Sequence, residues 1–276
     1  MSEHTLTDGP GGRRDGGRPL AVVTGASSGI GFELARQFAE HDFDLLVTAE
    51  DDELAEAARL LRDAGARVDT VTADLRTYDG VETVYAAIRA AGPVDAVALN
   101  AGIGVGGPFA TGPDLQAQLD VVHLNVTSQV HLARRVLPDM VARGSGRVLF
   151  TSSIAATQPG PFEAVYNASK AFLFSFAEAL RTELKDTGVT VSALLPGPTE
   201  TEFFERAGIE DTRLGQSTKD DPAEVARDGF EALMSGKDHV VAGSLRNRLM
   251  TAAAKIMPER AKAATHAKLS EPGSGT

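Results

Sequence analysis

Three polar side chains between Ser152 and Lys170 have types and spacings that suit proton transfer. Tyr166 and Lys170 are four residues apart, so in a helix they would share one face about one turn apart. Ser153 precedes a Gln-Pro-Gly-Pro segment that a helix does not cross, so it would approach from a separate element. An ammonium beside a phenol lowers the pKa of the phenol. Such a tyrosine can exchange a proton with an alcohol or carbonyl oxygen that a serine hydroxyl holds. The alternative is an exposed helix that merely carries a tyrosine and a lysine.

The elements that must position these residues alternate regularly from Leu20 onward. Apolar runs predict strands at 20–23, 44–48, 67–71, 94–99, 147–151, 190–194 and 238–241. Helical periodicity predicts helices at 30–40, 52–64, 80–91, 115–142, 164–187 and 222–235. This alternation predicts an α/β fold of three layers, a parallel sheet with helices on both faces. Ligands bind at the carboxyl ends of the strands in such a sheet.

The segment after the first strand is rich in glycine. Gly25, Gly29 and Gly31 follow the GxxxGxG spacing and open the next predicted helix. Glycines at this place let the backbone approach a pyrophosphate at a helix N-terminus. A plain strand-to-helix turn is the alternative.

The second predicted strand is followed by Ala49, Glu50, Asp51 and Asp52, a position that normally meets the adenosine ribose. A carboxylate there binds ribose hydroxyls and repels a 2′-phosphate, and no arginine is present in this segment. The glycine loop carries Ser28 and has no lysine or arginine that could bind a 2′-phosphate. The sequence therefore favours NAD(H) over NADP(H). Asp51 or Asp52 could instead only cap the following helix.

Small and polar residues also follow the later strands. Asp74 and Leu75 come after the third strand, where the carboxylate could bond an adenine amino group or cap a turn. Asn125 lies within an apolar helical run and needs a partner when buried; a structural role at a helix kink is the alternative. The remaining strand ends carry Asn100, Ala101 and Gly102, then Ser152 and Ser153, then Pro196, Gly197, Thr199 and Thr201.

Composition narrows the class of protein. The 276 residues include no cysteine and no apolar run long enough to span a membrane, and the net charge of −11 argues against general nucleic-acid binding. His123 and His131 have no ligand partner at metal-binding spacing, so no metal is expected. These features fit a cytoplasmic protein.

We expect a disordered leader at 1–18, a catalytic domain at 19–244 and a basic, partly helical tail at 245–276. Six lysines and arginines against two glutamates give the tail a charge of +4. Three alternatives remain for it: a helix packed on the domain or a partner subunit, an amphipathic membrane anchor, or a loosely ordered segment. Its possible apolar stripe consists of Leu249, Ala253, Ile256 and Met257.

The motifs TGASSGIG, NAG, PGPTET and the Ser153, Tyr166 and Lys170 set resemble the short-chain dehydrogenase/reductase family between about residues 20 and 241. The resemblance implies a Rossmann fold with seven parallel strands. It implies that Tyr166 is the acid/base, that Lys170 lowers its pKa and binds the nicotinamide ribose, and that Ser153 holds the substrate oxygen. Asn125 would position Lys170 through a water. Together with the strand-end residues above, the predicted cofactor-binding residues are Gly25, Ser27, Ser28, Gly29, Ile30, Gly31, Glu50, Asp74, Leu75, Asn100, Ala101, Gly102, Tyr166, Lys170, Pro196, Gly197, Thr199 and Thr201.

The implied function is hydride transfer between NAD(P) and a secondary alcohol or ketone, as in a short-chain alcohol dehydrogenase or carbonyl reductase. One alternative is a 3-oxoacyl-thioester reductase acting on acyl-carrier protein or coenzyme A thioesters, with the basic tail as a docking patch. Another is a nicotinamide-sensing protein without turnover. The insertion at 202–219 is expected to form a lid over a partly apolar small-molecule substrate. The helices at 115–142 and 164–187 are expected to pair in a homodimer or homotetramer.

Overall fold

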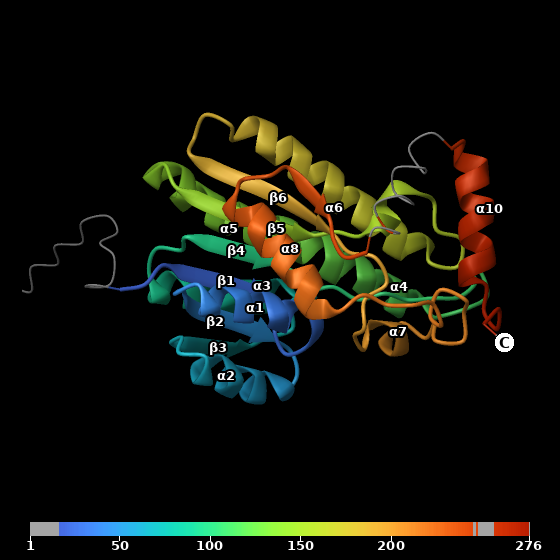
Figure 1. Cartoon of the computed structure of the whole chain (residues 1–276), viewed down its shortest axis with the longest axis horizontal. Helices are drawn as coiled ribbons and strands as arrows, with labels where there is room; N and C mark the ends of the chain where they lie inside the picture. The colour runs from blue at the N-terminus through green and yellow to red at the C-terminus, as the bar shows by residue number, and fades with distance from the viewer. Residues whose placement is uncertain (1–16, 245–246, 248–256, 276) are drawn as a thin grey trace, which may run out of the picture.

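Seven strands form one parallel sheet in the computed structural model, which describes residues 17–244, 247 and 257–275 (Figure 1). The sheet order is β3-β2-β1-β4-β5-β6-β7, so the chain reverses its direction of progress between β1 and β4. This reversal is the place where a doubly wound sheet opens a ligand crevice. The predicted fold class is confirmed. The strands are β1 Leu20–Thr24, β2 Asp44–Ala49, β3 Val68–Thr72, β4 Ala96–Leu99, β5 Gly146–Thr151, β6 Val189–Leu195 and β7 His239–Val241.

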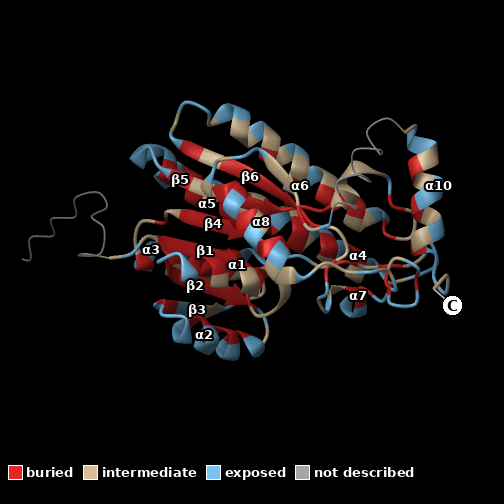
Figure 2. Ribbon diagram, in the orientation of Figure 1, coloured by how far each residue is buried: buried red, intermediate tan, exposed pale blue. Residues whose placement is uncertain are grey.

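Helices cover both faces of the sheet, which is why the central strands are apolar on consecutive residues. Every residue of β1 is buried (Figure 2). Val22 belongs to the core cluster of one face and Val23 to that of the other. One face carries α1 Gly29–Glu40, α2 Glu53–Asp63 and α8 Pro222–Met234. The other carries α3 Tyr78–Ala91, α5 Ser128–Arg143 and α6 Ala164–Glu183.

The single helix predicted at 115–142 was wrong, because a wide π-helical turn interrupts it. Helix α4 spans Leu115–Val122, the π turn η1 spans His123–Thr127, and α5 follows. Asn125 in this turn is completely buried. Its side-chain amide accepts from Ile103 N at 2.9 Å and donates to Ile103 O at 2.9 Å and Ser169 Oγ at 3.0 Å. The buried polar side chain thus finds its partners where the helix departs from regular geometry, as π turns often do near functional sites.

Three short elements lie beyond the carboxyl ends of the strands. They are the 3-10 helix η2 Ile154–Thr157, helix α7 Phe203–Arg206 in the insertion after β6, and helix α10 Glu259–Ser270 in the tail (Figure 1). Helix α10 packs on the domain, since Leu214 N donates to Leu269 O at 2.9 Å and Lys262 Nζ reaches Thr157 O at 3.4 Å.

Some sequence predictions fall outside the described residues. These are most of the leader and, in the tail stripe, Leu249, Ala253 and Ile256. Within the described ranges, no helix is long and apolar enough to cross a membrane.

Candidate functional site

The glycine loop after β1 has a backbone that only glycine accommodates. Gly25 and Gly29 have φ of +65° and +56°, in the left-handed region. Gly31 has no room for a side chain, because a Cβ there would overlap Gly25 O and lie 2.5 Å from Asn100 Nδ2. Ser28 occupies the N-cap of α1 without a side-chain capping bond. The loop therefore presents a helix N-terminus against close-packed backbone, the arrangement that suits a phosphate group.

Asn100 links β4 to this loop. Its Nδ2 donates to Thr24 O at 3.2 Å and Gly25 O at 3.3 Å, and its backbone N donates to Thr24 Oγ1 at 3.0 Å. Asn100 therefore holds the shape of the loop in addition to lining the cleft.

The residues after β2 and β3 differ from the sequence interpretation in one respect. Arg76, which that interpretation did not consider, lies beside Glu50, with its guanidinium 2.6 Å from Glu50 Oε2 and 2.8 Å from Asp74 Oδ1. Its side-chain hydrogen bond lowers the pKa of Asp74. The segment after β2 contains no arginine of its own, as predicted, but the chain after β3 brings Arg76 to the end of its neighbour β2. Part of the Glu50 charge is already offset.

Asp51 differs from its neighbours in having an unused oxygen. Its Oδ2 accepts from Ser27 Oγ at 2.9 Å, whereas its buried Oδ1 has no partner. Asp52 occupies the N-cap of α2 and makes no side-chain capping bond, so neither aspartate caps that helix. A buried carboxylate oxygen without a partner is suited to accept a hydrogen bond from a ligand hydroxyl.

The predicted catalytic residues come from β5 and α6. Lys170 is buried and donates from Nζ to Thr151 O at 2.9 Å, and its Nζ lies 5.7 Å from the Tyr166 ring centre. Ser153 Oγ accepts from Ala155 N at 3.1 Å, and its distance to Pro196 O is long for a hydrogen bond, at 3.4 Å. Ser152 instead donates to Lys170 O at 2.7 Å and so anchors α6.

The titration of Tyr166 differs from the sequence expectation. Burial raises the pKa of Tyr166 above its usual value, the Ser153 hydroxyl lowers it, and the negative charge of Glu163 raises it further. Burial also lowers the pKa of Lys170 to about 8. The expected net lowering of the tyrosine pKa was wrong for this structure, because burial disfavours the phenolate and is the largest influence on this side chain. At neutral pH Tyr166 is therefore a phenol, the protonation state of an acid.

Asn125 approaches Lys170 from the side of β4. A Cβ at Gly102 would lie 3.1 Å from both Asn125 Oδ1 and Lys170 Nζ, so the two polar atoms border the same small space. Asn125 does not line the cavity described below, and its amide bonds to Ser169, the residue before Lys170.

The segment after β6 closes over both parts of the site. Thr201 packs on Gly29, whose Cβ would lie 2.9 Å from Thr201 Cγ2. The Phe203 ring in α7 lies 5.1 Å from that of Tyr166. Thr199 Oγ1 donates to Gly197 O at 2.9 Å and is buried. The insertion therefore covers the glycine loop and the tyrosine together.

One cavity of about 550 Å³ joins these parts, a volume typical of a ligand site. All of the predicted cofactor-binding residues and Ser153 line it. Sequence reasoning missed Asp51, Gln158, Glu163, Phe203, Asn247, His266 and Leu269, which line it as well. A signal existed for three of these residues: Asp51 is next to Glu50, and Gln158 and Glu163 lie between Ser153 and Tyr166. No local pattern marks His266 or Leu269.

The residues present fit a dinucleotide. The glycine loop leaves backbone space that any side chain would fill, and Asp51 Oδ1 and Thr151 Oγ1 are buried acceptors without partners. These unused groups lie along the carboxyl edge of β1, β2 and β5, where a parallel sheet binds nucleotides.

Comparison with known proteins agrees with this geometry. A family model described as short chain dehydrogenase matches residues 19–211. The chain is 34% identical over 64% of its length to the ketoacyl reductase HetN of a Nostoc species, and the match spans 62% of that protein. It is 37% identical over 68% of its length to human 17-beta-hydroxysteroid dehydrogenase type 1, spanning 59% of that protein. A short-chain dehydrogenase from Sphingobium yanoikuyae in complex with NADPH superposes with a TM-score of 0.76 at 28% identity, covering 86% of this chain and 93% of the other.

The chain belongs to the short-chain dehydrogenase/reductase family. Members of this family are NAD(P)(H)-dependent oxidoreductases of alcohol and ketone groups, so the predicted reaction class is confirmed.

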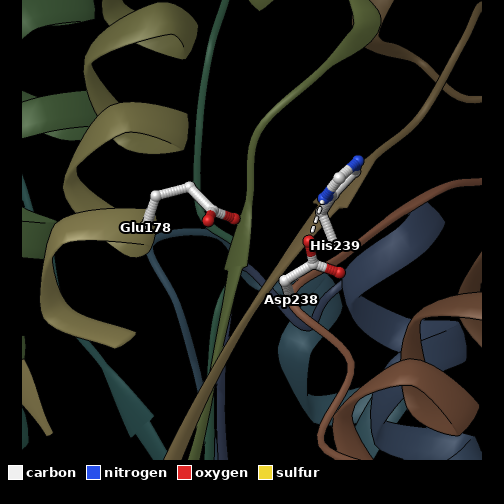
Figure 3. A group of neighbouring side chains, drawn as sticks. All are labelled: Glu178, Asp238 and His239. Atoms are coloured by element: carbon white, nitrogen blue, oxygen red, sulfur yellow. Dashed lines mark ion pairs between the residues drawn. The ribbon is translucent and has the colours of Figure 1, made fainter. Parts of the chain in front are cut away.

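A separate group of polar side chains lies between α6 and β7, away from the cavity lining. Glu178 of α6 faces Asp238 and His239, and His239 Nδ1 lies 3.0 Å from Asp238 Oδ2 (Figure 3). Asp238 is exposed, and the His239 pair accounts for its position. We assign no metal to this group.

His131, which the sequence analysis considered as a metal ligand, contacts Glu82 Oε1 at 2.6 Å and stacks on Tyr78.

Proposed function

We propose that this chain interconverts a ketone and a secondary alcohol held between Ser153 and Tyr166. The observation that supports this most directly is the convergence of these two residues and Lys170 on the cavity that also contains the glycine loop. A bound nicotinamide dinucleotide would lie along the glycine loop, Asp51 and Gly102 and would supply or accept the hydride.

Side chains of the protein carry out the proton transfer. In reduction, the Tyr166 phenol donates its proton to the carbonyl oxygen as negative charge develops there. The Ser153 hydroxyl donates a hydrogen bond to the same oxygen, since its own acceptor, Pro196 O, is distant. Lys170, with a pKa of about 8, stabilises the phenolate that remains and can return a proton to it. Asn125 positions Lys170 from behind.

The substrate we propose is a partly apolar ketone or alcohol. Apolar surface of the cavity that Tyr166 lines comes from Ile154, Phe203, Leu214 and Leu269. A 3-oxoacyl thioester is the second candidate, supported by the similarity to the ketoacyl reductase HetN. Activity on a panel of ketones and acyl thioesters with NADH and NADPH separates the two: preference for the thioesters would replace the first candidate.

Tyr166→Phe tests the proposal because it removes the proton and keeps the ring. We expect kcat for ketone reduction to fall by about a hundredfold or more. Binding of NADH or NADPH, followed by fluorescence titration, should be retained. Unchanged turnover would contradict the catalytic role of Tyr166. Cofactor binding by the wild-type protein with no turnover of any ketone or alcohol would instead support the sensing alternative.

We also propose a homodimer or homotetramer, with the outer face of α6 in the interface. Phe172 is 42% exposed and stacks on Phe176 at 5.7 Å between ring centres. An apolar ring pair of this kind favours burial against a second subunit. A monomeric mass by light scattering at micromolar concentration would contradict it.

A further inference from the structure

Three polar side chains are buried where helix α10 meets the start of α6. Glu163, His266 and Ser270 are only 3%, 4% and 1% exposed. Ser270 Oγ donates to Glu163 Oε2 at 2.8 Å, and His266 Nε2 lies 3.2 Å from both of these oxygens. On its other side, His266 Nδ1 lies 3.2 Å from Gln158 Nε2. Residues more than a hundred positions apart thus form one polar cluster.

The cluster borders the cavity. Gln158, Glu163 and His266 all line it, together with the apolar side chain of Leu269 from the same helix. Glu163 occupies the N-cap of α6 but makes no capping bond, and its carboxylate turns toward α10 instead. Among the described residues, none donates a hydrogen bond to its second oxygen, Oε1. The Glu163 side chain is only 4% exposed and borders the cavity, so this oxygen calls for a donor from a ligand or from water.

Glu163 is also close to the reaction centre. It precedes Tyr166 by three residues on α6, so the two side chains lie on one helix face about one turn apart. The influence of Glu163 on the pKa of Tyr166 agrees with this proximity. A group bound by Glu163 would therefore be only a few bonds from the carbon that reacts at Tyr166.

We propose that the Glu163–His266–Ser270 cluster binds a second hydroxyl group of the substrate, so that the preferred substrate is a hydroxyketone or diol with an apolar body. This inference rests on the proposed function. Glu163 Oε1 accepts the hydroxyl proton, and the imidazole of His266 lies beside the hydroxyl oxygen. The same carboxylate repels a substrate with an acidic group at this position.

Holding α10 in place does not by itself require the cluster. Lys262 Nζ contacts Thr157 O at 3.4 Å, Leu269 O accepts from Leu214 N at 2.9 Å, and Gly275 N donates to Asp211 O at 2.9 Å. These contacts join α10 and the residues after it to η2 and to the insertion after β6. Because these contacts already hold α10, the cluster that borders the cavity is available to bind a group of the substrate.

The test compares pairs of ketones of equal carbon skeleton, one with and one without a hydroxyl group a few carbons from the carbonyl. For the wild-type enzyme, kcat/KM should be about tenfold or more higher for the best hydroxyketone than for its deoxy partner, the worth of a hydrogen bond to a charged group. Glu163→Gln and Ser270→Ala should each bring this ratio close to one. Because the ratio is taken within one variant at one pH, a change in the pKa of Tyr166 cancels.

Thr265→Ala is the matched control, since Thr265 lies on the exposed face of α10. It should keep the wild-type ratio, and thermal melting should show that all variants fold. Equal kcat/KM for both members of every pair in the wild-type enzyme would overturn the inference and leave the proposed function intact. An equal loss for both ketones in the Glu163 and Ser270 variants would also overturn it, because the cluster would then act as an anchor only. Unchanged turnover in Tyr166→Phe would instead refute the proposed function.

Discussion

The two ends of the cavity are built in different ways. At the end expected to hold the cofactor, backbone and short side chains come from consecutive strand ends between Gly25 and Gly102. At the substrate end, long side chains come from Glu163, Phe203 and His266, which lie far apart in the sequence. The cofactor end binds a dinucleotide that all members of the family use, whereas the substrate end has to fit the substrate of this protein. A change at the first should therefore affect every reaction, and a change at the second should affect the choice of substrate.

The largest effect is expected at Gly31. In Gly31→Ala, the new Cβ would overlap Gly25 O, so the loop must shift away from the position that suits a pyrophosphate. We expect affinity for NADH and NADPH to fall by about a hundredfold or more, measured by fluorescence titration. Gly65→Ala is the control: φ is +95° there but nothing lies within 4 Å, so a modest loss of stability with normal cofactor affinity is expected. Normal affinity in the Gly31 variant would refute the assignment of the loop.

At the other end, Phe203→Ala should remove the apolar surface that faces Tyr166. The ring lies 5.1 Å from that of Tyr166. We expect KM for a partly apolar ketone to rise by about tenfold, with cofactor affinity retained. Steady-state kinetics with each substrate varied separately provides the measurement. An equal loss of cofactor affinity would show that the two ends are not independent.

A smaller effect concerns the choice between the two cofactors. We keep the prediction that NAD(H) is preferred. In the structure, Asp51 supports this prediction more strongly than Glu50 does. Glu50 pairs with Arg76, whereas Asp51 has an unpartnered buried oxygen. Asp51→Asn should therefore shift the ratio of kcat/KM for NADH and NADPH toward NADPH by several-fold, and Glu50→Gln should shift it less. A tenfold wild-type preference for NADPH would contradict the prediction.

The last expected effect is on stability at alkaline pH and not on activity. Burial lowers the pKa of Lys170 from 10.5 to about 8, so between these values the unfolded chain binds a proton that the folded chain has lost. Stability contributed by this group therefore rises with pH across that window. Relative to Lys170→Met, the wild-type unfolding free energy should rise by up to about 1.4 kcal/mol per pH unit. Urea unfolding at several pH values measures this difference, and a constant difference would contradict the lowered pKa.

Several features of this protein were predictable from short stretches of sequence. Consecutive apolar residues such as those of β1 predicted a sheet covered on both faces, and the TGASSGIG and Tyr166–Lys170 motifs predicted the family. These predictions succeeded because strand burial, glycine φ angles and helical spacing are local consequences of residue type.

Tertiary structure decided the rest. The π turn at Asn125 depends on partners at Ile103 and Ser169, and the salt bridge of Arg76 with Glu50 depends on the neighbouring positions of β2 and β3. The burial that raises the pKa of Tyr166 comes from the packing around it. His266 reaches Glu163 only because α10 folds back across the cavity. Sequence alone determined which chemical groups are available. Folding determined their distances and their desolvation, and through these their pKa values and the substrate that the cavity can hold.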